Sequence, residues 1–320
     1  MTRLRFALPS KGRLQEQVTA WLEDAGLKLK AGARDYRAAI EGEPDVEIKL
    51  MSSAEIAGAL ASGDVHFGIT GEDLVRDTVP DSGRVIALLQ PLGVGFADVV
   101  VAVPRAWIDV ATMADLDDVC TAFHAHHRRR LRVATKYLSL TRNFFAAHGI
   151  TDYRIVESLG ATEGAPAAGV AEAIVDITTT GATLAANDLK VLDDGVILKS
   201  QAQLAAALRA DWTEPVLQTA GRICARIAAR ELARNCYLLR AAISVNGDKL
   251  RAKLAQSGVS VITAGEETQT LLCPRDELSS ALMLLRELGA RGEIAVERVE
   301  YVFGERNPPF ARLTAALGRT

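Results

Sequence analysis

Ala173-Ile-Val-Asp-Ile-Thr-Thr-Thr-Gly-Ala-Thr-Leu184 begins as a strand of the buried type, passes an acid, and breaks into hydroxyl side chains and a glycine where a helix can start. Short hydroxyls and backbone N–H groups together can bind one phosphate group, and a glycine lets the backbone approach it closely. Asp176 precedes these groups, within reach of a sugar hydroxyl beside that phosphate. A threonine-capped turn between a strand and a helix uses the same residue types, so the stretch alone leaves both interpretations open. The candidate phosphate-binding residues are Thr178, Thr179, Thr180, Gly181, Ala182 and Thr183.

Strands and helices alternate along most of the chain around this stretch. Leu4–Leu8, Leu131–Lys136 and Tyr153–Ser158 each have a strand pattern, and the first two lead into a helical pattern. The β-branched runs Val85–Leu89 and Asp98–Val103 are typical of parallel strands buried on both faces. This alternation predicts an α/β fold, in which ligands bind at the carboxyl ends of the strands.

The size and composition of the chain predict a globular protein of two or three domains. Its 320 residues exceed the size at which a single core keeps growing, and 49% of them are hydrophobic and 24% charged. The formal net charge of −3 gives no reason to expect nucleic acid or an anionic membrane as a partner. No run of about 18 apolar residues and no signal-peptide pattern occurs, so we expect a cytoplasmic protein without a membrane span.

Neither the cysteines nor the histidines follow the spacing of a metal site. His124, His126 and His127 end a predicted helix next to three arginines that would repel a cation, and we interpret them as a basic helix end. The cysteines lack a C-x-x-C spacing and are interpreted as reduced core thiols. They are Cys120, Cys224, Cys236 and Cys273. We therefore predict no metal site built from protein ligands.

Two pairs of basic residues are further candidates for binding an anion. Lys11 and Arg13 follow the first strand where a helix begins, and their charges suit a polyphosphate. Solvated surface charge explains them equally well. Arg34 and Arg37 can converge on a phosphate or pair with neighbouring acids, and the sequence does not decide between these.

Other candidate ligand groups lie in segments that follow strands. Thr70 and Gly71 end a strand and offer hydroxyl and backbone groups, although the acids after them also suit a helix start. Glu163 lies in a glycine-containing loop ahead of the phosphate-binding candidates. Ser52, with Glu55 three residues later, predicts a capping box at the start of a short helix.

The last third of the chain has a different pattern from the rest. Its order of elements, βαββαβ, predicts a ferredoxin-like module with no evident catalytic residue, which we interpret as a binding or regulatory domain. The tail from Gly304 onward has no usable periodicity. The predicted elements are strand 237–244, helix 248–256, strands 259–263 and 269–273, helix 277–288 and strand 294–302.

Four motifs in this order resemble those of the ATP phosphoribosyltransferases, which catalyse the first step of histidine biosynthesis. The resemblance covers residues 4–235. The motifs are Leu8-Pro-Ser-Lys-Gly-Arg-Leu14, Asp64-Val-His-Phe-Gly-Ile-Thr-Gly-Glu-Asp-Leu74, Arg132-Val-Ala-Thr-Lys-Tyr137 with Leu140-Thr-Arg142, and Asp176-Ile-Thr-Thr-Thr-Gly-Ala-Thr-Leu184.

The resemblance implies a fold and a division into domains. The catalytic body would have two domains similar to those of periplasmic binding proteins, formed by residues 1–94 with 189–235 and by residues 95–188. ATP and phosphoribosyl diphosphate would bind between them. Residues 236–320 would form the ferredoxin-like domain, with a regulatory role.

The resemblance also implies roles for the candidate residues. The threonine-glycine stretch would bind the 5′-phosphate, and Asp176 would hold the ribose hydroxyls. Lys11 would assist catalysis, and with Arg13, Arg34 and Arg37 it would face the diphosphate or the phosphates of ATP. Glu163 would contact the ribose or a Mg²⁺ ion bound to the diphosphate.

The chain departs from the family pattern in two respects. Many members have Arg-Pro-x-Asp where this chain has Met51-Ser-Ser-Ala-Glu55, so one arginine contact is missing. The body resembles the short members, which use a partner similar to histidyl-tRNA synthetase, whereas the third domain resembles that of the long, histidine-inhibited members. The resemblance implies a homo-oligomer, either a dimer or a hexamer. The alternatives are a non-catalytic two-domain binding protein and a phosphoribosyltransferase for another acceptor.

Overall fold

A computed structural model describes residues 3–31, 38–79, 82–243, 253–254, 257–265 and 267–319. Arg34, Arg37 and all but two residues of the predicted helix 248–256 lie outside these ranges. The chain divides into two compact units. The first comprises residues 1–23, 28–219 and 311–320, and the second comprises residues 24–27 and 220–310.

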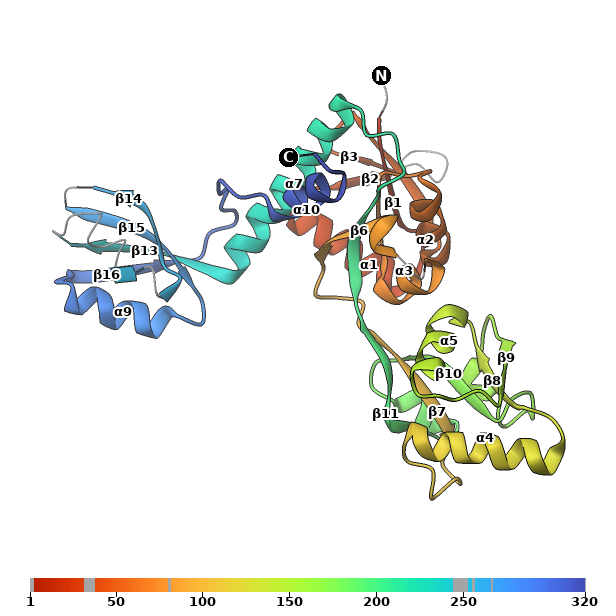
Figure 1. The fold of residues 1–320 in the computed structure, drawn as a ribbon. Helices are drawn as coiled ribbons and strands as arrows, with labels where there is room; N and C mark the ends of the chain where they lie inside the picture. Colours follow the sequence, from red (N-terminus) through yellow and green to blue (C-terminus); the bar gives the residue numbers. More distant parts are fainter. Residues whose placement is uncertain are drawn as a thin grey trace. The chain divides into compact units, whose positions relative to one another are not determined.

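The first unit contains two five-stranded sheets (Figure 1). In one of them, with strand order β4-β1-β5-β12-β6, the strands β4, β1 and β5 are parallel, and β12 is antiparallel to both of its neighbours. Apolar side chains fill the core on this sheet, and Leu4, Phe6, Ile48 and Phe67 are almost completely buried. The strands are β1 (Leu4–Pro9), β4 (Val46–Met51), β5 (Phe67–Gly71), β6 (Ile86–Pro91) and β12 (Ala202–Ala207).

The helices of this sheet begin at the ends of its strands. The α1 helix buries Val18, Trp21 and Leu22 on one face. Ser52 caps α2, and Glu55 closes the predicted capping box, which is therefore confirmed. The elements are α1 (Gly12–Asp24), α2 (Ser53–Ser62), α3 (Glu72–Thr78), the 3₁₀ turn η1 (Ser82–Arg84), and a two-stranded ribbon of β2 (Leu29–Ala31) and β3 (Ala38–Ile40).

The second sheet has the order β11-β7-β10-β8-β9, in which β10, β8 and β9 are parallel. The β7 strand is antiparallel to both β10 and β11. Its elements are β7 (Ala97–Pro104), α4 (Met113–His127), β8 (Leu131–Thr135), α5 (Leu138–Ala147), β9 (Tyr153–Glu157), η2 (Thr162–Gly164), β10 (Ala173–Thr178), α6 (Ala182–Ala186) and β11 (Leu189–Ser200).

The chain crosses from the first sheet to the second between β6 and β7 and returns between β11 and β12 (Figure 1). This two-lobed α/β arrangement is the periplasmic-binding-protein-like body that the resemblance implies, and that prediction is confirmed. The predicted direction of two strands is wrong. The β7 strand is largely buried, whereas β6 lies at the edge of its sheet and is only partly buried, and the pairings described for both are antiparallel.

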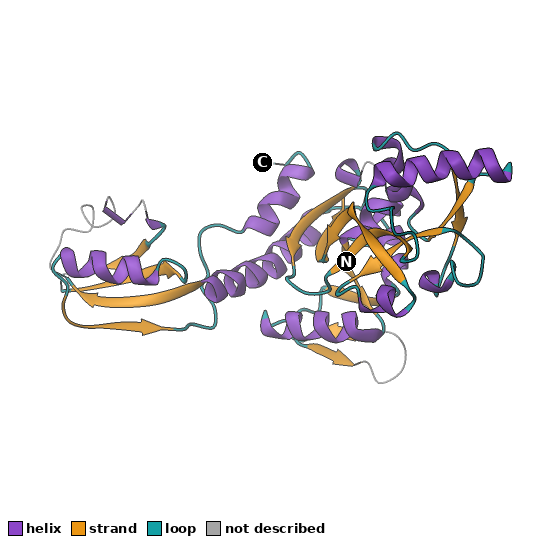
Figure 2. Cartoon of the chain, turned by 90° about the horizontal axis from the view of Figure 1, so that it is seen from below, coloured by secondary structure: helices purple, strands orange, loops and turns teal. Residues whose placement is uncertain are grey.

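The second unit contains a four-stranded antiparallel sheet with the order β14-β15-β13-β16. The last strand in the chain, β16, lies beside the first, β13, and the third, β15, lies between β13 and the second, β14. This is the arrangement of a split βαβ module. Helix α9 runs along one face of this sheet (Figures 1 and 2). The predicted ferredoxin-like pattern is confirmed by these strands. The elements are β13 (Cys236–Ala242), β14 (Ser260–Ala264), β15 (Thr268–Pro274), α9 (Leu278–Glu287) and β16 (Arg291–Glu297).

Two further helices complete the chain, and one of them was not expected. The α7 helix spans Glu214–Asn235. The tail, in which we found no periodicity, forms α10 (Pro308–Ala316). Its Leu313 is fully buried, and the Arg312 guanidinium donates to the carbonyl of Leu89.

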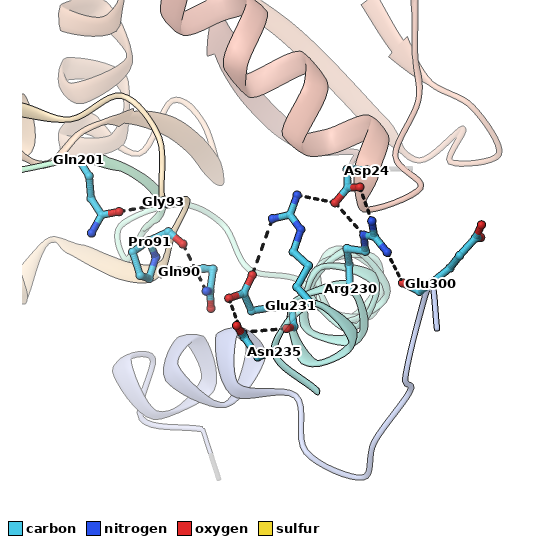
Figure 3. A network of polar contacts seen from close by, with 10 residues as sticks. Asp24, Gln90, Pro91, Gly93, Gln201, Arg230, Glu231, Asn235 and Glu300 are labelled. Atoms are coloured by element: carbon cyan, nitrogen blue, oxygen red, sulfur yellow. Dashed lines mark hydrogen bonds and ion pairs between the residues drawn. The ribbon is translucent and has the colours of Figure 1, made fainter. Parts of the chain in front are cut away.

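Within the second unit, Asp24 lies at the centre of a network of charged groups (Figure 3). Its carboxylate accepts a hydrogen bond from Nε of Arg230 at 2.7 Å and pairs with Arg234. Arg230 also donates to the carbonyl of Glu300 at 2.7 Å, and the Tyr301 hydroxyl donates to the Asp24 carbonyl at 3.1 Å. The hydrogen bond from Arg230 lowers the pKa of Asp24, so this carboxylate remains ionised.

Glu172 ties the beginning of β10 to β8. It accepts hydrogen bonds from Nη2 of Arg132 at 2.7 Å, from the Arg132 backbone N–H at 2.8 Å and from Nη2 of Arg129 at 3.1 Å. Burial alone would raise the pKa of Glu172, but the hydrogen bonds from Arg132 and Arg129 outweigh it and lower the pKa to about 2.

We predict that Glu172→Gln reduces the free energy of unfolding at pH 7 by about 2 kcal/mol, because it leaves two arginines without their carboxylate. Since the pKa is lower in the folded protein, ionised Glu172 stabilises the fold above pH 4.5 and loses that effect as the pH falls towards 2. Chemical denaturation across this range should show the two proteins converging at low pH. Glu157→Gln, at an exposed position on β9, serves as the control. A constant difference across the range would contradict the assignment.

Candidate functional site

Asp176, near the carboxyl end of β10, and Lys136, directly after β8, lie on neighbouring strands. These strands are parallel, and their last paired residues are Val175 and Thr135, so Asp176 and Lys136 occupy the next position on each. Burial raises the pKa of Asp176, and the negative charge of Glu163 raises it further. The hydrogen bond from the backbone N–H of Ile177, at 2.8 Å, and the positive charge of Lys136 lower it. Asp176 and Glu163 were predicted site residues, and the charges of Lys136 and Glu163 both act on Asp176.

Lys136 is a candidate for the site that the sequence analysis did not name. It stood inside the motif Arg132–Tyr137 without a role. The signal that identifies it is positional, because it follows a strand that neighbours β10, and this pairing is not visible in the sequence.

The stretch after β10 forms an exposed turn that is held by its own hydroxyl groups. The N–H of Gly181 donates to Oγ1 of Thr178 at 2.8 Å, and the N–H of Ala182 donates to Oγ1 of Thr180 at 3.4 Å. The Thr179 hydroxyl donates to the Phe96 carbonyl at 3.1 Å. The turn is thus capped by threonine, as one of the two interpretations supposed, and it also presents several polar groups to solvent.

Gly181 has a conformation that suits an open binding turn. Its φ is +75°, in the left-handed region, and a Cβ atom placed there would meet nothing within 4 Å. Ala182 and Thr183 follow it as exposed residues at the start of α6. Space for a ligand beside the backbone therefore exists at this glycine.

The predicted residues of the first sheet lie at the carboxyl ends of β1 and β5. Lys11 and Arg13 are exposed at the start of α1. Thr70 is completely buried, and its hydroxyl donates to the Ser53 carbonyl at 2.8 Å. Gly71 precedes α3. The ligand contacts assigned to these residues, and those of Arg34 and Arg37 outside the described ranges, stay predictions.

One histidine of α4 has a carboxylate beside it. Nδ1 of His124 lies 3.0 Å from Oδ1 of Asp152, a carboxylate partner that sequence reasoning had not found. Across the ranges that the structure describes, no three His, Cys, Asp or Glu side chains are grouped so that they could hold a metal ion. None of the described helices is long and apolar enough to cross a membrane.

Comparison with known proteins gives a consistent answer. The sequence model of the ATP phosphoribosyltransferase family matches residues 52–229. The ATP phosphoribosyltransferase of Rhodopseudomonas palustris strain BisA53 is 54% identical over 318 residues, 98% of each chain. That of Bradyrhizobium diazoefficiens is 53% identical over 320 residues, again 98% of each chain. The chain belongs to the ATP phosphoribosyltransferase family.

A solved structure agrees on the fold of the body. The ATP phosphoribosyl transferase (HisG:HisZ) complex from Thermotoga maritima aligns with a TM-score of 0.54 and 21% identity, and the alignment covers 70% of this chain and 96% of that one. Enzymes of the ATP phosphoribosyltransferase family use ATP and phosphoribosyl diphosphate and require a divalent metal ion. The chain is accordingly a pentosyltransferase of the first step of histidine biosynthesis.

We predict that Asp176→Asn raises the melting temperature at pH 7 by a few degrees. The pKa of Asp176 is raised by burial, so its ionised form destabilises the folded protein above that pKa, and the gain from asparagine should shrink as the pH falls. Asp115→Asn provides a control of opposite sign. Asp115 accepts from the N–H groups of Ala111 at 2.9 Å and Thr112 at 2.8 Å, which lower its pKa, so its loss should lower the melting temperature. Differential scanning calorimetry distinguishes the two, and a destabilised Asp176→Asn protein would contradict the prediction.

Proposed function

We propose that this protein transfers the phosphoribosyl group of phosphoribosyl diphosphate to N1 of the adenine of ATP and releases diphosphate. The observation that carries the assignment of the site is the turn after β10, in which Asp176, exposed threonines and an unobstructed Gly181 follow one another at a strand end. In the family, these residue types at this spacing belong to the phosphoribosyl diphosphate loop.

The turn binds the 5′-phosphate in this proposal. The threonine hydroxyls and the N–H groups around Gly181 donate to the phosphate oxygens, and the glycine allows the close approach. The present pairing of Gly181 N–H with Thr178 and of Ala182 N–H with Thr180 keeps these donors in one small turn. Asp176 accepts hydrogen bonds from the ribose hydroxyls, which replace the water around a half-buried carboxylate.

The basic residues of the first sheet bind the phosphate groups other than the 5′-phosphate. Lys11 and Arg13, together with Arg34 and Arg37, face the diphosphate or the ATP phosphates. The contacts of Thr70 and Gly71 come from backbone groups, because the Thr70 hydroxyl donates to the Ser53 carbonyl. Glu163, whose charge acts on Asp176, contacts the ribose or the metal ion.

The divalent metal ion is Mg²⁺ in this proposal, and it fits the residues present. A Mg²⁺ ion retains several waters and is bound through one or two carboxylates plus substrate phosphates. Asp176 and Glu163 can supply those carboxylates, and the diphosphate supplies the rest. When bound, the ion neutralises charge on the leaving diphosphate.

The reaction needs no nucleophile from the protein. The N1 lone pair of adenine forms a bond to C1′ of the ribose, and the bond from C1′ to the diphosphate oxygen breaks with its electron pair on the diphosphate. The side chains named above hold C1′ and N1 in line and stabilise the charge that develops. Positioning and preorganised electrostatics can supply most of the acceleration.

The direct test is an assay with ATP, phosphoribosyl diphosphate and Mg²⁺ that follows the absorbance of the phosphoribosyl-ATP product. Turnover with ATP supports the proposal. Turnover with a free nucleobase and none with ATP would instead favour a phosphoribosyltransferase for another acceptor. Binding without turnover of either would favour a non-catalytic binding protein.

We predict that Thr180→Val and Gly181→Val raise the KM for phosphoribosyl diphosphate at least tenfold. A hydrogen bond to a charged group contributes about 1.5–3 kcal/mol, and valine at Gly181 is disfavoured at its φ of +75°. Steady-state kinetics with both substrates measures the effect. Thr121→Val, at an exposed position in α4, is the matched control. Michaelis constants near those of the unchanged protein in both variants would show that the stretch is only a turn.

We further propose that the second unit binds histidine as a feedback inhibitor. The strand order of this unit is that of the module that carries this function in the long members of the family. We also propose that the protein is a homo-oligomer, a dimer or a hexamer, and that it works in the cytoplasm.

We predict that isothermal titration with histidine gives saturable heat and that the same concentrations inhibit the enzyme. Gly181→Val should retain this heat, because the altered turn lies in the other unit. The absence of both heat and inhibition up to millimolar histidine would rule out this role.

A further inference from the structure

Lys136 lies beside the residue that holds the ribose in the proposed function. The register of β8 and β10 pairs Val133 with Ala173 and Thr135 with Val175, so Lys136 and Asp176 follow on adjacent strands. Adjacent strands are about 4.8 Å apart, which places the two residues within reach of one small ligand. The charge of Lys136 acts on Asp176.

The ammonium group of Lys136 is exposed and is not used by a salt bridge. Its Nζ lies over the ring of Tyr137, 5.0 Å from the ring centroid. Among the residues described, no carboxylate lies within ion-pair distance of Nζ, which leaves its donors available for a ligand. Lysine binds phosphate as a compact point charge.

The ring beneath Lys136 is held by buried hydrogen bonds. The Tyr137 hydroxyl donates to Oδ2 of Asp73 at 2.7 Å, and the Ser200 hydroxyl donates to Oδ1 of Asp73 at 2.8 Å. The exposed fractions of these residues are 1% for Tyr137, 5% for Asp73 and 2% for Ser200. The N–H of Tyr137 also donates to Oγ1 of Thr135 at 2.9 Å. The ring therefore has one position, and it limits the directions that the lysine can take.

In the proposed function, negative charge gathers near C1′, and a cation such as the ammonium group of Lys136 would offset it. Asp176 and Glu163 both carry negative charge beside the ribose, and the leaving diphosphate gains more as its bond to C1′ breaks. The 2′-hydroxyl is attached to the carbon next to C1′, so a ribose held through its hydroxyls by Asp176 has its leaving group close to the neighbouring strand end.

We propose that Lys136 binds the diphosphate of phosphoribosyl diphosphate and stabilises its charge as it leaves, and that Tyr137 and Asp73 position Lys136. The inference rests on the proposed function of the turn after β10. Lys136 is assigned as a substrate-contacting residue, whereas Tyr137 and Asp73 act through it.

The first test compares Lys136→Met and Lys136→Arg with the unchanged protein. Methionine keeps the aliphatic packing over Tyr137 and removes the charge. We expect Lys136→Met to lower kcat/KM for phosphoribosyl diphosphate about 100-fold and to weaken inhibition by diphosphate at least tenfold, while the KM for ATP stays within about twofold. Lys136→Arg should recover part of the loss. A kcat/KM within about threefold of the unchanged protein, or an equal loss for ATP, would overturn the proposal.

A binding measurement separates this proposal from the proposed function. Isothermal titration with phosphoribosyl diphosphate needs no turnover. If the unchanged protein binds this compound but does not use ATP, the proposed reaction fails, and a weaker Lys136→Met complex still supports the role of Lys136. If the unchanged protein does not bind it, both proposals fail.

The positioning role is tested with a double-mutant cycle. Tyr137→Phe keeps the ring but removes the hydrogen bond to Asp73, and we expect it to lower kcat about fivefold. In the Lys136→Met protein the same change should have no further effect, because the group on which it acts is gone. An equal loss in both backgrounds would show a merely structural role. If Tyr137→Phe does not fold, Ser200→Ala removes the other side-chain donor to Asp73 and takes its place in the cycle.

Discussion

Asp73 of α3 is buried and Asp77 is half-buried, and the arrangement of the first unit depends on the hydrogen bonds that these two carboxylates accept. Asp73 accepts hydrogen bonds from Tyr137, at the start of α5, and from Ser200, at the end of β11. Asp77 accepts from the N–H groups of Ser139 at 2.8 Å and Leu140 at 2.9 Å, and so it caps α5. A buried carboxylate without such donors would cost several kcal/mol. Helix α3 of the first sheet therefore lies against α5, the helix that follows β8 in the second sheet.

This constraint fixes the geometry of the site. Lys136 directly precedes Tyr137, so the segment that satisfies Asp73 also sets the position of the cation at the end of β8. Asp176 lies on the neighbouring strand, and its position follows from the register of β10 with β8. Tyr137 and Ser200 are held by their buried hydrogen bonds to Asp73. The turn from Thr178 to Thr183 is held by its own hydroxyl groups and is open to solvent. Rigid supports under a small open turn are what binding a phosphate requires.

The sequence predicted the parts of the fold that local chemistry determines. Strands of buried type, the capping box at Ser52 and the threonine-glycine turn all have local signals, and each was found in place. The strand β12 was not predicted, because Ala202–Ala207 is rich in alanine, which disfavours strands; the pairing of β12 between β5 and β6 imposes the conformation. The antiparallel direction of β7 and the position of Lys136 beside Asp176 also depend on pairing between distant segments. The α10 helix was missed because only Leu313 and few other residues give it an apolar face.

Two carboxylates along β10, Glu172 directly before it and Asp176 within it, differ in how far their hydrogen-bonding capacity is used. At its beginning, Glu172 accepts hydrogen bonds from Arg132 and Arg129, which lower its pKa to about 2. Within the strand, Asp176 accepts from the N–H of Ile177 alone among the described residues, and burial raises its pKa. The carboxylate oxygens of Glu172 are occupied by these hydrogen bonds, so they are not available to a substrate. Asp176 is half-buried, and among the described residues neither it nor the neighbouring Lys136 forms an ion pair. In the proposed function, the hydroxyls of a bound ribose supply the hydrogen bonds that the described protein groups do not, and this offsets the cost of burying the carboxylate.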